Sequence, residues 1–121
     1  MIFALALLAA APGELGPPDA MKRSMESGFA WKVCALENAA RYAALDDSPE
    51  LLIQAAMGRC NGKEQEFRVS LHYIAVDGNA AFLNEHVDQL VAKQRKEIEG
   101  EVLSAILETR LHQAQSSKKK N

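Results

Sequence analysis

The stretch CALENAARYAALDDSPELLIQAAMGRC, residues 34–60, begins and ends with the only two cysteines of the chain. It has one strong break, Asp-Asp-Ser-Pro at 46–49, and Cys34 and Cys60 each lie 13 residues from Asp47. Alanine and other helix-forming residues fill both sides of this break. We therefore expect a helical hairpin that carries one cysteine on each arm, at the same height above the turn.

The break also contains the signals that end one helix and begin another. Ser48 can cap a helix, Pro49 suits a first turn because it has no N–H to leave unpaired, and Glu50 favours the positive end of the dipole. We expect the first helix over 19–45, capped by Asp19, and the second helix to begin at Pro49.

Equal height alone does not bring two cysteines together, because packed helix axes lie about 8–10 Å apart and a disulfide needs Cα atoms within about 7 Å. Small residues on both arms allow a closer approach. They are Ala35, Ala39, Ala40, Ala43, Ala44, Ala55, Ala56 and Gly58. We expect a Cys34–Cys60 disulfide that closes a loop of about 26 residues and adds about 3.5 kcal/mol of stability. The alternative is two reduced thiols in a cytosolic protein.

The rest of the chain extends this hairpin into a bundle. A third helix is expected over 80–113, and three arms of similar length predict an all-α, up-down-up three-helix bundle. The sequence leaves open whether 61–76 continue the second helix or break from it at Asn61-Gly62. Residues 67–76 also alternate like a strand, but a lone strand would have no partner, so we favour helix.

Apolar residues recur every three or four positions along these helices, as on a buried helix face. In the first helix they are Met21, Met25, Phe29, Val33, Leu36, Ala40 and Ala43, beside a second stripe of Trp31, Cys34, Asn38, Tyr42 and Leu45. In the later helices they are Ile53, Ala56, Met57, Cys60, Phe67, Leu71, Ile74, Leu83, Val87, Leu90, Ile98, Val102, Ala105 and Ile106. Trp31 is expected in the core, with stacking on a ligand as the alternative.

The two ends of the chain differ from this helical domain of 19–113. Residues 2–11 are apolar and precede Pro12 and Gly13, which is typical of a secretory signal over 1–13, followed by a Pro/Gly-rich leader over 14–18. No Lys or Arg precedes the apolar run, so a start upstream or at Met21 is an alternative. Ten apolar residues are too few for a membrane span of about 20. Residues 114–121 are expected to form a flexible basic tail.

The chain of 121 residues has a net charge of −2, which provides no broad basic surface for nucleic acid. His72, His86 and His112 lack the spacing of a helical metal site, and neither a Gly-rich phosphate loop nor a nucleophile triad is evident. We therefore expect no catalytic residue, metal or cofactor. Lys93 with Glu97, and Arg95 with Glu99, are expected as exposed ion pairs on the third helix.

Two surfaces are candidates for binding. Reflection through the turns places Lys32, Asn61, Glu64 and Lys93 at one level, where they could form a polar waist, or else simply face water. The segment VLSAILETRL at 102–111 is apolar on more than one side, with Leu103 and Leu107 outside the main stripe. These two leucines predict a face for a protein partner or for self-association.

With its leader, the segment from Ala30 to Cys60 resembles a class of small exported bacterial proteins of unknown function. These have an Ala-rich helix, a short polar turn and a second helix, with one cysteine on each arm. The resemblance implies export to the periplasm or secretion and a bridged hairpin, and it assigns no active-site residue.

Together these features predict an exported, non-enzymatic helical protein that binds another protein in the cell envelope. The alternative is a cytosolic regulator or phage-type accessory protein that begins near Met21, with reduced thiols. A small enzyme or metal carrier is the third hypothesis.

Overall fold

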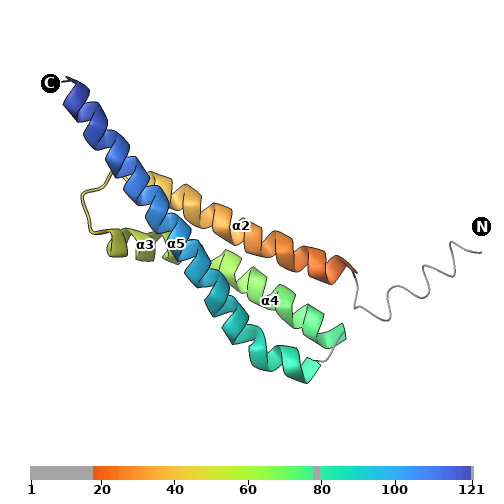
Figure 1. Ribbon diagram of the computed structural model, residues 1–121. Coiled ribbons are helices and arrows are strands. Elements are labelled where there is room, and N and C mark those ends of the chain that lie inside the picture. The colour runs from red at the N-terminus through yellow and green to blue at the C-terminus, as the bar shows by residue number, and fades with distance from the viewer. Residues whose placement is uncertain (1–17, 78–79, 121) are drawn as a thin grey trace, which may run out of the picture.

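The computed structural model describes residues 18–77 and 80–120, with side chains described over 20–74 and 85–118. All secondary structure in these residues is α-helical, in the order α2 (Pro18–Tyr42), α3 (Pro49–Gly58), α4 (Asn61–Asp77) and α5 (Ala80–Lys120) (Figure 1). The all-α prediction is confirmed, and the segment 67–76 is helix rather than strand. The predicted signal peptide at 1–13, and residues 14–17 of the predicted leader, lie outside the described residues.

The second arm of the predicted bundle consists of two helices. The described residues therefore contain four helices, and the three-helix up-down-up bundle is not confirmed. α3 ends at Gly58, and a turn at Arg59 and Cys60 precedes α4, which includes Gly62. In the turn the Cys60 amide donates to the Met57 carbonyl at 3.0 Å. The weak helix propensity of the glycine and asparagine residues here favours an interruption.

The first turn follows the prediction from its sequence. The Ser48 hydroxyl accepts a hydrogen bond from the Leu51 N–H at 3.4 Å, and Pro49 occupies the first helical position of α3. α2 already begins at Pro18, so the predicted cap Asp19 lies inside the helix. From α5, the Arg110 guanidinium donates to the carbonyls of Leu45, at 3.0 Å, and of Asp47, and this ties the connection between α2 and α3 to α5.

α2 packs against all three other helices, and α4 also packs against α5. The residues buried where these helices meet form one core. They are Trp31, Ala35, Ala39, Leu52, Ala56, Met57, Cys60, Phe67, Leu71, Val87, Val91, Ile98, Val102 and Ile106. Most of the predicted core of the later helices is confirmed, and Trp31 is fully buried. Leu90 is instead 39% exposed, and the side chain of Leu83 lies outside the described residues.

The buried face predicted for α2 is wrong at its N-terminal half. Met21, Met25 and Phe29 are 54%, 74% and 64% exposed. The buried stripe instead carries Trp31 and small residues, including Ala35 and Ala39. Small side chains let α4 and α5 approach α2 closely, whereas a row of methionines on that face would hold them apart.

α5 is longer than the sequence analysis predicts. It continues to Lys120, so residues 114–120 of the predicted tail are helical, and 111–118 are exposed. In Figure 1 its C-terminal end extends past the connection between α2 and α3. Among the described residues, every helix is either too short or too polar to span a bilayer.

Candidate functional site

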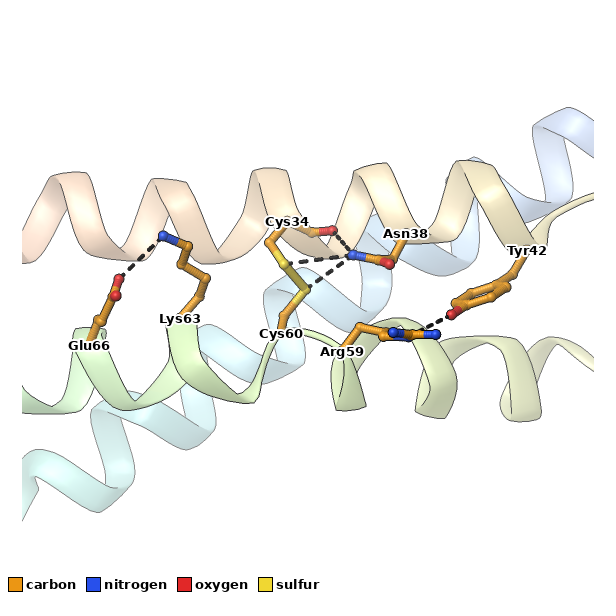
Figure 2. The surroundings of a disulfide bond; sticks show 7 residues. All are labelled: Cys34, Asn38, Tyr42, Arg59, Cys60, Lys63 and Glu66. Carbon is orange, nitrogen blue, oxygen red and sulfur yellow. Dashed lines mark hydrogen bonds and ion pairs between the residues drawn. A yellow bond between two sulfur atoms is a disulfide. The ribbon is translucent and has the colours of Figure 1, made fainter.

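The two cysteines form the predicted disulfide. The Cα atoms of Cys34 and Cys60 are 6.0 Å apart, which confirms the register read from the turn (Figure 2). The Asn38 amide donates to the Cys34 carbonyl at 2.9 Å and lies 3.7 Å and 3.6 Å from the two sulfur atoms. Cys60 is buried and Cys34 is half-buried, so the bridge lies within the contact between α2 and the turn that joins α3 to α4.

Only some of the small residues that we expected to let the two arms approach closely are buried. Ala35, Ala39, Ala43 and Ala56 are buried, whereas Ala40, Ala44, Ala55 and Gly58 are exposed. The close approach therefore depends on one alanine stripe of α2 and one alanine of α3. Next to it, the Arg59 guanidinium donates to the Tyr42 hydroxyl at 3.1 Å, which links the end of α3 to the end of α2 (Figure 2).

Two residues of the predicted polar waist, Lys32 and Glu64, pair with different residues of α5. The Lys32 ammonium lies 3.2 Å from the Glu101 carboxylate of α5. The Glu64 carboxylate is buried and accepts from the Arg95 guanidinium of α5. Asn61 is exposed and, with Arg95, lines a pocket beside α3. Lys93 is exposed on α5. The structure thus does not assemble these four side chains into one site.

The Glu64–Arg95 pair is the polar feature that the sequence analysis missed. Arg95 was expected to pair with Glu99 on the solvent face of its own helix. Instead its guanidinium lies 6.0 Å from the centre of the Trp31 ring and reaches across to Glu64. The Trp31 indole N–H is buried without a hydrogen-bond partner, and its ring lies 5.9 Å from that of Phe67. This cluster fixes the position of α5 relative to α2 and α4.

The structure also contains an open groove between α2 and α4, about 780 Å³ in volume. It is lined by small side chains of α2, among them Ala20, Ser27 and Ala30, and by Val69 and Tyr73 of α4. Arg23, Glu26 and Glu66 add charges of both signs. No signal in the sequence identified this groove, because it depends on how α4 lies against α2.

The predicted partner face on α5 is exposed. Leu103, Leu107 and Leu111 are 37%, 50% and 59% exposed and recur every fourth residue. We call these three residues the leucine row. The opposite side of α5 is occupied by the core, through Ile98, Val102 and Ile106. α5 therefore has two apolar faces, and the fold of the described residues covers one of them.

The described residues contain no group of three or more His, Cys, Asp or Glu side chains placed to hold a metal ion. His72, His86 and His112 lie on different helices or many turns apart, as their positions in the chain predict. The absence of catalytic residues, metal and cofactor stays a prediction.

Neither a protein-family model, nor a curated protein, nor a solved structure matches the chain.

Proposed function

We propose that the protein is exported and acts, without catalysing a reaction, by binding another protein in the cell envelope through the leucine row of α5. The observation that carries this proposal is the exposure of Leu103, Leu107 and Leu111 on a helix whose other apolar face is already buried. Burying a fully exposed leucine side chain is worth about 1.5–3 kcal/mol, and covering these three partly exposed leucines offers a partner about half of that for each. An apolar row of this spacing suits docking against a groove or another helix.

Two further features support export. A disulfide persists in oxidising compartments and is rare in the cytosol. The Cys34–Cys60 bridge links the two arms of a hairpin in a small domain, where a single crosslink is a large share of the stability. The apolar segment 2–11 of the sequence fits the same compartment as a secretory signal.

Mass spectrometry of the protein from its native host tests the compartment. Export predicts an N-terminus near residue 14 and a mass two hydrogens below that of the reduced chain. The alternative, a cytosolic regulator that begins near Met21, predicts an unprocessed chain with two free thiols. Finding reduced cysteines in the native host would overturn the export half of the proposal.

A binding experiment tests the role of the leucine row. The oxidised protein serves as bait for an envelope extract, beside the double variant Leu103→Ser/Leu107→Ser. Leu51→Ser is the control, because Leu51 is at least as exposed as the two replaced leucines but lies on α3. We expect a partner that the control retains and the double variant loses. Retention by all three baits would place the partner on another surface and contradict the proposal.

A further inference from the structure

A second apolar surface lies on α2, on the side away from the α2–α4 groove. Met21, Met25 and Phe29 recur every fourth residue and are more than half exposed. Leu90 of α5, 39% exposed, extends this surface. The Gln94 amide donates to the Gly28 carbonyl at 3.3 Å, and Lys32 pairs with Glu101, so α2 and α5 run parallel here. Met25 lies about one turn before Gly28 on α2, and Leu90 lies about one turn before Gln94 on α5. Because the helices are parallel, Met25 and Leu90 are therefore at the same height along the pair. We call these four residues the methionine face.

The methionine face is large for a helix surface that faces water. At the exposed fractions given above, its four side chains expose roughly 400 Å² of apolar area, within the range of the largest patches on monomeric proteins. Such patches commonly mark an interaction surface. Methionine is also flexible and polarizable, which suits contact with another protein.

The pattern of the face points to a second copy of this chain as its occupant. A two-fold interface presents the same patch on both subunits, so that patch must complement itself. The row Met21–Met25–Phe29 is evenly spaced about Met25. When two α2 helices pack antiparallel about a two-fold axis at Met25, the two Met25 side chains meet, and Met21 meets Phe29 of the partner subunit. Rows of residues four apart pack in this way, with the helices crossing at about −50°.

The charges beside the row fit the same arrangement. Lys22 and Glu26 lie together along one side of the row, 4.0 Å apart and well exposed. In an antiparallel pair the same side of each helix meets its counterpart. Lys22 then lies two residues along the axis from Glu26 of the partner subunit, within reach of its long side chain, and the two Glu26 side chains lie equally close to each other. The two glutamates near the axis are thus flanked by two lysines, and each Lys22 can pair with Glu26 of the partner subunit.

We infer that the methionine face is the interface of a homodimer, formed by antiparallel packing of α2 about Met25. With the rims included, the two faces bury on the order of 1,000 Å² in total, which is at the lower limit for a specific interface. The dimer is therefore reversible. The dimer leaves the leucine row of α5 free. The dimer and the proposed function can therefore be tested independently of each other.

Sedimentation equilibrium of the oxidised full chain over a wide concentration range tests this inference. The wild-type chain should associate to a dimer. Met25→Lys places two like charges together on the axis and should weaken the dimer by about 100-fold or more. Leu51→Lys, at an exposed leucine on α3 outside both apolar faces, is the matched control and should leave the dimer intact. A monomer at every concentration, a dimer that survives Met25→Lys, or a dimer that is lost in Leu51→Lys would overturn the inference.

Charge reversal and crosslinking test the arrangement itself. Lys22→Glu and Glu26→Lys should each weaken the dimer by several-fold, and the double variant should restore it, because the contacts are then re-formed with their signs exchanged. Met25→Cys should give a disulfide-linked dimer on oxidation, and Leu51→Cys should not. If the double charge variant is weaker than either single one, or if Met25→Cys stays monomeric, the antiparallel dimer is wrong.

Discussion

Gly28 lies where α2, α4 and α5 come close together. A Cβ atom at this position would be 3.2 Å from the ring of Phe67 and 3.4 Å from the amide nitrogen of Gln94. The Gly28 carbonyl also accepts the hydrogen bond from that amide. The absence of a side chain therefore permits the contact between three helices, which is why a glycine is tolerated in the interior of α2.

Gly28→Ala should lower the free energy of unfolding by about 1 kcal/mol. The added methyl group gains helix propensity but pushes on the Phe67 ring in a packed core. Gly100→Ala is the control, because nothing lies within 4 Å of its Cβ position, and it should raise stability by about 1 kcal/mol. Urea unfolding of both variants measures the difference. Equal stabilisation by the two substitutions would contradict the close contact.

The Glu64–Arg95 pair gives a second prediction about single residues. Arg95→Met leaves a buried carboxylate without its charged partner and should cost about 2–3 kcal/mol, less than for a fully buried pair because Arg95 is partly exposed. The double variant Glu64→Gln/Arg95→Met should recover most of this loss. Lys32→Met breaks the more exposed pair with Glu101 and should cost about 1 kcal/mol or less. Urea unfolding at neutral pH checks all three, and a double variant no better than Arg95→Met would contradict the buried pair.

At the scale of the elements, the disulfide joins α2 to the turn between α3 and α4. The variant Cys34→Ala/Cys60→Ala should be less stable by about 3.5 kcal/mol, because the unfolded chain regains the freedom of the loop that the bridge closes. A reducing agent should cause a similar loss in the wild-type chain and none in the double variant. Urea unfolding with and without the reducing agent measures both effects, and an unchanged wild-type midpoint would contradict this role.

The last turns of α5 and Arg110, just before them, should contribute differently to the stability of the fold. Deleting 111–121 should change the free energy of unfolding by less than about 0.5 kcal/mol, because the side chains described there are exposed. Arg110→Ala in the full chain should cost about 1 kcal/mol, because two carbonyls of the α2–α3 connection lose their charged donor. Hydrogen exchange should then be faster across 43–48. If the deletion cost more than Arg110→Ala, the last turns of α5 would have a structural contact that their exposure does not indicate.

At the scale of the whole molecule, self-association links stability to concentration. If two copies meet through the methionine face, the thermal midpoint of the wild-type chain should rise with protein concentration, because the dimer forms only from folded chains. Met25→Lys should have a midpoint that does not depend on concentration. Calorimetry at several concentrations measures this dependence. A wild-type midpoint that stays constant would argue against the dimer.

Much of the hairpin could be predicted from sequence because its signals are local. Ser48 and Pro49 define a helix start within three residues, and two cysteines at equal distances from a turn define their own register. Two members of the leucine row, Leu103 and Leu107, could be predicted for the same reason. Residues four apart on one helix share a face whatever the tertiary structure.

The predictions that failed depend on how helices lie against one another. α2 has two adjacent stripes that could be buried, one rich in methionine and one in alanine with Trp31. Hydrophobicity favours the first, but close packing of α4 and α5 requires the second, so the methionines were misassigned to the core. The Glu64–Arg95 pair joins residues 31 positions apart, and only the position of α5 across α4 brings them together.

The sequence by itself determined an all-helical chain with a corner at Ser48-Pro49 and a bridge between its two cysteines, because capping, helix propensity and chain register act over a few residues. Only the tertiary structure decided which stripe of α2 is buried, where the second arm divides and which charges pair. Those outcomes depend on the distances and angles between helices, which are set by the competition of many side chains for the same volume.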